Sequence, residues 1–442
     1  MPNGFFPASD SIARKRQPLL IPRCNSCGLY RKCKSGKMKV FGGGKRGILI
    51  VGEAPGKDED FHGIPFVGKS GIKLRDTLRE FDVDMDRDCW RTNALICWPW
   101  VESKGQKRNR SPLDKEVNFC RPNLVNAIKE LKPSTIILLG KFAVHSLMGW
   151  LWRENDIGKI GKWIGWKIPC QSLNCWICPA WHPSFLLRAS GDSDLEGEEY
   201  DGGEGWSGKD RRAGNEVREL LWKRAIQAAC ELQGRPWKEV PDWKKHVQVV
   251  LSPDGAAVWL DTLRKRNVPL ALDYETNMKK PDSDKARIVS CAVSDGNTSI
   301  SYPWHGKAIQ ATEQLLLSDT PLIGYNLKFE NRFSHAILGV VPKNWVWDGM
   351  MAAHVLDSRP GITGLKFQAF ALLGQEAWNE QVEPFLKSND EGGNSENRIG
   401  EVRPETLLLY GGLDALLEWK VAQVQMKQMG LNINEICSIP NR

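Results

Sequence analysis

Residues 52–71 read GEAPGKDEDFHGIPFVGKSG, and they follow the β-branched run GILIV at residues 47–51. The run predicts a buried strand, and the segment after it predicts a loop crowded with glycines, carboxylates and one phenylalanine. Glycines let backbone amides approach a ligand, and a ring such as Phe66 can stack on a flat one. The carboxylates, which can accept hydrogen bonds or transfer protons, are Glu53, Asp58, Glu59 and Asp60. The stretch therefore predicts a site for a flat ligand on a loop at the end of a strand.

The same loop also matches a phosphate-binding pattern. Residues 63–70, GIPFVGKS, fit the GxxxxGKS motif, in which Lys69 and Ser70 would hold phosphate and magnesium. That motif needs a strand that runs directly into the loop, whereas the β-branched run ends well before it. Pro65 and Phe66 also occupy the turn that should wrap a phosphate. We therefore disfavour a nucleoside triphosphatase.

The length and charge of the chain set its general class. Its 442 residues exceed what one hydrophobic core usually organises, and its 41% hydrophobic content can build two cores. The net charge of +8 is compatible with a polyanionic partner. Residues 98–110 place Trp98 and Trp100 beside lysines and arginines, which suits nucleic-acid contact as well as a solvated basic surface. Neither a signal peptide nor an apolar run of about 18 residues is present, so we expect an intracellular, cytoplasmic protein without a membrane partner.

Changes in composition divide the chain into segments. After a basic tail at residues 1–23, residues 24–233 alternate strands with helices, which predicts an α/β domain with a largely parallel sheet. Within it, residues 189–214 are acidic and rich in glycine, and they predict a mobile surface insertion. A linker with two prolines at residues 234–245 precedes residues 246–442. There a meander of β-type runs followed by helices predicts an α+β or α/β domain.

The cysteines form a candidate metal site. In a reducing compartment the 12 cysteines are expected to be metal ligands or buried side chains rather than disulfides. A CxxC pair begins the first domain, and two later cysteines are the next candidates to complete four thiolates; together these are Cys24, Cys27, Cys97 and Cys120. Four thiolates suit zinc or a 4Fe-4S cluster, and their spacing does not choose between the two. No role is assigned to Cys33, Cys170, Cys175 and Cys178, and the last three are expected to be buried.

Several motifs occur in order along residues 24–225. They are the CxxC pair, GEAPG with the following PFVG, Thr92-Asn93 leading into Cys97, the NRSP of residues 109–112 before Cys120, STIILLG, and His182-Pro183-Ser184. This ordered set resembles the family 4 uracil-DNA glycosylases. The resemblance implies the parallel-sheet fold of uracil-DNA glycosylases, uracil-containing DNA as partner, and a structural 4Fe-4S cluster on the four cysteines. The segment between Cys97 and Asn109 is longer and more basic than the family usually has.

The resemblance also implies roles for individual residues. Phe66 would stack on a base taken out of the DNA, and Asn93 would read its edge and select uracil over cytosine. His182 would stabilise the negative charge that grows on the base as the glycosidic bond breaks. Glu53 and Glu59 would orient Asn93 or the attacking water. The other pocket positions are Gly52, Ala54, Gly56 and Ser184. The alternative is a module that keeps this pocket but only binds DNA, senses uracil or supports processivity.

A second set of chemistry-bearing residues lies in the C-terminal half. Asp273 and Glu275 are two apart in ALDYET, so both project from one face of a predicted strand. Such carboxylates repel each other unless cations neutralise them. Tyr410 precedes Asp414 by four residues, a helical spacing that places the phenol beside the carboxylate. NLKFE at residues 326–330 follows another apolar run, and Asp348 opens DGMMAAHVLD.

These motifs together resemble the DEDDy 3′-5′ exonuclease domain of family A DNA polymerases over residues 246–430. The resemblance implies an RNase H-like (DnaQ-type) fold and two magnesium or manganese ions, which stabilise the attacking and leaving oxygens. The implied ligands are Asp273, Glu275, Glu330 and Asp414. Tyr410 would position the attacking water, and Asn326 would contact the DNA 3′ end. Glu330 stands where the family usually has aspartate, so a fold kept only as a scaffold is the alternative.

The two resemblances together predict a replication or repair protein. It would combine recognition or excision of uracil with proofreading-type exonuclease activity. No polymerase motif fits after Asp414, so a separately encoded DNA polymerase is the expected partner, an arrangement that suits a virus.

Overall fold

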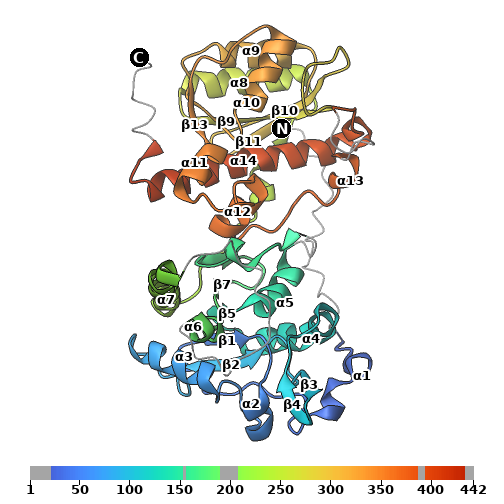
Figure 1. The fold of residues 1–442 in the computed structure, drawn as a ribbon. Coiled ribbons are helices and arrows are strands. Elements are labelled where there is room, and N and C mark those ends of the chain that lie inside the picture. Colours follow the sequence, from blue (N-terminus) through green and yellow to red (C-terminus); the bar gives the residue numbers. More distant parts are fainter. Residues whose placement is uncertain (1–20, 153–155, 190–207, 387–393, 434–442) are drawn as a thin grey trace. The chain divides into compact units, whose positions relative to one another are not determined.

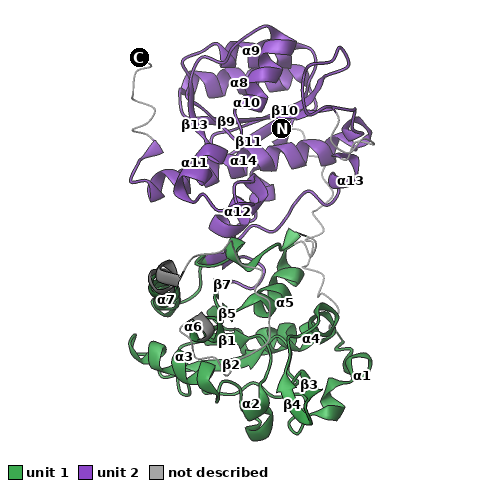
Figure 2. Ribbon diagram, in the orientation of Figure 1, with its two compact units in different colours: residues 1–167, 175–236 green, residues 168–174, 237–442 purple. Residues whose placement is uncertain are grey.

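The computed structural model describes residues 21–152, 156–189, 208–386 and 394–433. Two compact units are distinguished: residues 1–167 with 175–236 form unit 1, and residues 168–174 with 237–442 form unit 2 (Figure 2). Most of the predicted basic tail and of the insertion at residues 189–214 lies outside the described residues. The last part of the insertion, residues 208–214, begins helix α7, Gly208–Cys230.

Unit 1 is built on a parallel sheet with the strand order β2-β1-β5-β7 (Figure 1). These strands are β1 Ile48–Gly52, β2 Cys89–Asn93, β5 Thr135–Leu139 and β7 Cys175–Ala180. Every residue of β1 and β5 is buried, as expected for apolar strands that are covered on both faces. Strand β6, Ile168–Cys170, falls in the short segment that groups with unit 2.

Helices cover both faces of this sheet. Figure 1 shows α3, α6 and α7 on one side and α4 and α5 on the other. Ile48 and Ile50 join a core cluster with Leu74 of α3 and Trp222 of α7. The remaining bounds are α1 Cys24–Cys27, α2 Lys57–His62, α3 Lys69–Arg79, α4 Asp114–Leu131, α5 Lys141–Leu151 and α6 Pro183–Ala189, with a hairpin of β3 Trp100–Ser103 and β4 Gln106–Asn109. The predicted α/β architecture is confirmed.

Unit 2 contains a mixed sheet with the order β13-β12-β9-β10-β11-β8. The strands are β8 Val247–Val249, β9 Leu270–Thr276, β10 Ile288–Ser294, β11 Ser299–Pro303, β12 Leu322–Gly324 and β13 Trp345–Asp348. Strands β9, β10 and β11 form an antiparallel meander, while β12 runs parallel to β9 and β13 parallel to β12. This arrangement, with β8 added at the edge, is the predicted RNase H-like fold.

The long helix α14, Pro404–Gln428, lies across the sheet of unit 2 (Figure 1). Gly411 and Gly412 permit its close approach, because a Cβ on Gly412 would collide with Val247 of β8 and one on Gly411 would lie 3.4 Å from Glu275 Cγ. The other helices are α8 Pro253–Arg266, α9 Lys307–Leu316, α10 Lys328–Phe333, α11 Gly349–Leu356, α12 Leu365–Leu373 and α13 Glu383–Leu386. In the described part of the chain, no helix has the length and apolar character needed to cross a membrane.

Candidate functional sites

The first candidate site lies at the carboxyl ends of β1 and β2. Gly52 and Asn93 are the last residues of these strands and are paired in register. A Cβ built on Gly52 would collide with Asn93 Oδ1 and with the ring of Phe66, so glycine is required here for the amide and the ring to meet. The structure thus brings together three predicted pocket residues. Their place, outside the carboxyl ends of parallel strands, is where open α/β sheets bind ligands.

Glu59 holds the loop that carries Phe66. Its Oε1 accepts a hydrogen bond of 2.6 Å from the Phe66 N–H, and its Oε2 accepts one of 2.5 Å from the Gly56 N–H. Phe66 has a left-handed φ of 61°, which these bonds and the tight packing of its carbonyl on Gly71 support. Burial raises the pKa of Glu59. Glu59 therefore holds the loop that carries the ring, and its predicted role of orienting Asn93 or the attacking water stays a prediction.

His182 follows β7 and presents its ring to Phe66. The two ring centroids are 6.5 Å apart with an interplanar angle of 28°. His182 Nδ1 lies 2.8 Å from Ser184 Oγ and accepts a hydrogen bond of 3.3 Å from the Ser184 N–H. A ring nitrogen that accepts from an amide carries no proton, so the neutral imidazole has its proton on Nε2. His182 is thereby prepared to donate a hydrogen bond from Nε2.

Two more of the residues predicted for this loop have different surroundings. Glu53 Oε1 accepts a hydrogen bond of 3.3 Å from the Phe142 N–H at the start of α5, and Gly140, with a φ of 93°, leaves room for that carboxylate. Ala54 packs beside the cysteine cluster. Lys69 does begin helix α3, but α2 separates it from β1, so the loop is not a phosphate-binding loop.

The four predicted cysteine ligands surround one cavity. Cys24, Cys27, Cys97 and Cys120 line one small pocket, together with Leu95 and Phe119. Burial, with Cys24 and Cys27 contributing, raises the pKa of Cys120 to about 11. Tetrahedral bonding to one zinc would bring the four sulfurs to about 3.8 Å from one another. Among the described residues, no set of three or more cysteine sulfurs lies within 4.8 Å of one another. The spread of the thiols therefore suits a multi-atom centre such as a 4Fe-4S cluster better than a single ion.

The cysteines without an assigned role have different surroundings. Cys33 Sγ lies 3.3 Å from the carbonyl oxygen of Leu29 and 3.5 Å from that of Trp98, and it also contacts the Cys97 thiol. Cys170, Cys175 and Cys178 are buried, as expected.

The long basic segment before Asn109 forms the β3–β4 hairpin. Its turn is made by Lys104 and Gly105, with left-handed φ values of 52° and 68°. Lys107 Nζ lies 4.2 Å from the centroid of the Trp100 ring. A Cβ on Gly56 would lie 3.5 Å from Asn109 Nδ2, so the base of the hairpin borders the pocket loop.

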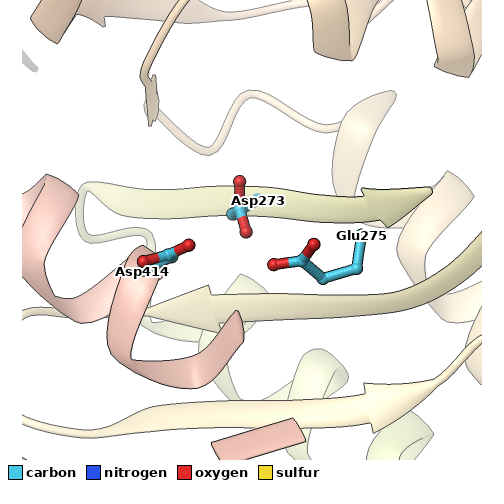
Figure 3. A group of neighbouring side chains, drawn as sticks. All are labelled: Asp273, Glu275 and Asp414. Atoms are coloured by element: carbon cyan, nitrogen blue, oxygen red, sulfur yellow. The ribbon is translucent and has the colours of Figure 1, made fainter. Parts of the chain in front are cut away.

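The second candidate site is a carboxylate cluster in unit 2. Asp273 and Glu275 from β9 and Asp414 from α14 offer oxygens that all lie within 4.8 Å of one another. Figure 3 shows the three carboxylates turned toward a common centre. Glu330, the fourth predicted ligand, is buried on α10, where burial and then the charge of nearby Asp273 raise its pKa, but it lies outside this group.

The cluster has the electrostatics of a cation site. Burial is the largest cause that raises the pKa values of Asp273, Glu275 and Glu330 well above their ordinary range, and neighbouring carboxylates add to it. Asp273 Oδ2 and Glu330 Oε2 are buried without a hydrogen-bond partner. Unpartnered carboxylate oxygens in a protein interior are costly unless a cation neutralises them. Hard divalent ions that prefer oxygen ligands fit this donor set.

The other predicted residues of unit 2 frame this cluster. Tyr410 lies one turn before Asp414, and burial followed by the Asp414 charge raises its pKa. Asn326 has a left-handed φ of 70°, and its N–H donates to Asp348 Oδ1 at 3.1 Å. Asp348 also accepts from the Leu327 N–H and caps α11, so it fixes the turn that begins α10.

Three further residues at this site were not predicted from the sequence. Glu418 is buried one turn after Asp414, and burial and the charge of Asp273 raise its pKa. The helical spacing that singled out Tyr410 would also have found Glu418. Lys366 forms an ion pair with Asp414, and the Trp378 indole donates to the same carboxylate at 2.6 Å. No local spacing indicates these two residues, because they reach the cluster from the region of α12.

The raised pKa values predict how pH affects the stability of the metal-free protein. Between the ordinary values of 3.8 to 4.5 and the raised values, the folded cluster binds more protons than the unfolded chain. The free energy of unfolding should therefore decrease as pH rises above about 4.5. Calorimetry of the full chain in a chelator should show this decrease in stability. The relevant unfolding transition is the one whose temperature changes when Mn²⁺ is added in place of the chelator. Glu418→Gln should have a shallower pH dependence, and an unchanged one would contradict the assigned cause.

Comparison with known proteins agrees with this geometry. The model of the uracil DNA glycosylase superfamily matches residues 40–200. The type-4 uracil-DNA glycosylase of Pyrobaculum aerophilum is 35% identical over 176 residues, 38% of this chain and 82% of that protein. The corresponding protein of Saccharolobus solfataricus is 31% identical over 169 residues, 38% of this chain and 74% of that protein.

Among solved structures, Trypanosoma brucei RNase D aligns with 43% of this chain and 69% of its own, with 12% identity and a TM-score of 0.35. The fold of unit 2 rests on its own strand order. The motifs around the pocket and the extent of the sequence match to type-4 enzymes lead to one conclusion: through its first unit, this chain belongs to the uracil DNA glycosylase superfamily.

Proposed function

We propose that unit 1 excises uracil from DNA. The observation that carries this proposal is the meeting of Asn93 and Phe66 at Gly52, at the end of the parallel sheet, with the His182 ring stacked against Phe66. A base flipped out of the DNA would stack on Phe66, and the Asn93 amide would read its edge. His182 would donate to a base carbonyl as negative charge grows on the leaving uracil. Glu53 is the candidate to orient the attacking water.

We assign the four cysteine thiols around the cavity to a 4Fe-4S cluster. The ligands would be Cys24, Cys27, Cys97 and Cys120. The cluster would join the α1 segment to the first half of α4 and to the loop after Asn93, and so would stabilise the pocket. A zinc-loaded protein would lack the visible absorbance that an iron-sulfur centre gives.

We further propose that unit 2 removes nucleotides from DNA 3′ ends, beside a separately encoded DNA polymerase. Asp273, Glu275, Glu330 and Asp414 would hold two magnesium or manganese ions, and Tyr410 would position the attacking water. Bound ions of this kind stabilise the attacking and leaving oxygens of phosphodiester hydrolysis. The unpartnered oxygens of Asp273 and Glu330 support this assignment, although Glu330 would have to approach the other ligands.

One experiment separates the two activities. The full chain is incubated with labelled single-stranded and duplex oligonucleotides that contain one uracil, in EDTA or in magnesium. Abasic product in EDTA supports the glycosylase, and mononucleotides that appear only in magnesium support the exonuclease. Retained DNA binding without abasic product at any enzyme concentration would favour the uracil-sensing or processivity alternative for unit 1.

We expect the β3–β4 hairpin to contact the DNA backbone. Its exposed Lys107 and Arg108 stand on the element that borders the pocket loop. Lys107→Ala/Arg108→Ala should reduce the slope of log affinity against log salt by about 2, or about 1 for each lost phosphate contact. Fluorescence anisotropy at several salt concentrations measures the slope.

The matched control is Lys45→Ala/Lys132→Ala. Both lysines are exposed, and they precede β1 and β5, so they lie at the opposite end of the strands from the pocket. An equal loss of slope in the control would show that the hairpin has no particular role.

A further inference from the structure

We propose that Lys366 is a tethered counter-ion that occupies the cation position beside Asp414 and competes there with one of the divalent ions. This inference rests on the proposed metal-dependent activity of unit 2. It concerns how the site is filled and adds a residue to which the sequence assigned no role.

The contacts of Asp414 carry the inference. The Lys366 ammonium and the Trp378 indole N–H both donate to the same atom, Asp414 Oδ1. A carboxylate oxygen offers about two lone pairs, so these two donors fill Oδ1. A divalent ion can therefore use Oδ1 only after Lys366 withdraws.

The Lys366 ammonium is held by two aromatic rings as well as by the Asp414 carboxylate. Its Nζ lies 4.2 Å from the Trp378 ring centroid and 4.8 Å from that of Tyr410. Two aromatic faces and a carboxylate are a favourable environment for an ammonium group. The same position covers the face of Tyr410, the residue proposed to position the attacking water. Withdrawal of Lys366 would thus free Asp414 and Tyr410 together.

The charge balance explains why a second cation is still needed. The positive charge of Lys366 acts on Asp273, Glu275 and Glu418 and opposes the rise of their pKa values. Yet Asp273 Oδ2 and Glu418 Oε2 remain without hydrogen-bond partners. One lysine therefore neutralises only part of the cluster. The unpartnered oxygens offer one ion an uncontested place, whereas an ion at Asp414 Oδ1 must displace the lysine.

Lys366 can leave without unfolding its surroundings. Its side chain is 21% exposed, and a lysine has a flexible stem that can carry its charge to solvent. Metal binding can therefore displace Lys366 by a change of side-chain position alone.

Binding of Mn²⁺ to the metal-free full chain tests the inference. Titration followed by electron paramagnetic resonance should show one tight and one weak ion in the wild type. Lys366→Met should strengthen the weak site about 10-fold or more, because it removes a competing positive charge a few ångströms from the ion. Lys366→Arg, which keeps the charge, should retain the weak second site.

Lys420→Met is the matched control. Lys420 also lies near two indole rings, at 5.3 Å from the Trp419 centroid and 5.6 Å from that of Trp243, but the carboxylate whose charge acts on it is Asp295, outside the cluster. Its Mn²⁺ binding should equal that of the wild type.

A measurement on the wild type avoids dependence on the folding of any variant. Lys366 acetylation by an amine-reactive reagent, quantified by mass spectrometry, should increase at Mn²⁺ concentrations that fill the weak site. Protection of Lys366 by Mn²⁺ would overturn the inference, as would two equally tight ions in both wild type and Lys366→Met. The latter result would leave the proposed nuclease intact. Absence of any Mn²⁺ binding would overturn both the nuclease proposal and the inference.

Discussion

His182→Ala is expected to slow the release of uracil about 10² to 10³-fold, the usual cost of losing one preorganised donor to a developing anion. The structure prepares this donor, because the Ser184 N–H bonds to His182 Nδ1 and leaves the proton on Nε2. The negative charge on the leaving base appears only as the bond breaks. Loss of the donor should therefore lower the rate of the chemical step and leave DNA affinity nearly unchanged.

Single-turnover release of uracil from a duplex oligonucleotide measures this effect. His62→Ala is a suitable control, because His62 lies in α2 near the same loop but is exposed and bonds only to the Asp58 carbonyl among the contacts described for it. It should stay within about twofold of the wild type, as substitutions away from the chemistry usually do. A full rate in His182→Ala would exclude His182 as the donor.

Asp273→Asn should reduce nucleotide release from 3′ ends by more than the roughly 100-fold that loss of a metal's outer-shell partner costs. The substitution keeps the shape of the side chain but removes one of the three carboxylates whose oxygens lie within 4.8 Å of one another. The same change should make the metal-free protein melt at a higher temperature. This is because burial and the Asp414 charge raise the pKa of Asp273, so its ionised form destabilises the folded state at neutral pH.

Two readouts therefore distinguish a metal ligand from an ordinary buried residue. Nuclease assays in magnesium report the first effect, and thermal melting in EDTA reports the second. Asp254→Asn removes an exposed carboxylate paired with Lys307 and should change neither. Lower stability of Asp273→Asn in EDTA would contradict the destabilising effect assigned to the buried Asp273 charge. Nucleotide release at the wild-type rate would contradict the role of Asp273 as a metal ligand. Uracil release should be normal in this variant, because its pocket lies in unit 1.

The apolar pattern predicted the parallel α/β sheet of unit 1, whereas for unit 2 it left α+β or α/β open, and the family resemblance supplied the RNase H-like fold. In unit 1 the apolar runs GILIV and TIILL are short and β-branched, and helices separate them, which allows only a covered parallel sheet. In unit 2 the alternation of LALDYET and the four-residue spacing of Tyr410 and Asp414 place their side chains on defined faces. Patterns of this kind are local, so they can be read without knowledge of the rest of the fold.

Only the tertiary structure decided what the neighbours of these residues do. Glu59 was expected near the chemistry, but its two backbone hydrogen bonds show that it holds the Phe66 loop. Lys366 and Trp378 meet Asp414 across long separations in the chain, where no periodic pattern connects them. The physical reason is that periodicity determines the face from which a side chain projects. The partner that it meets there depends on how distant helices and strands pack.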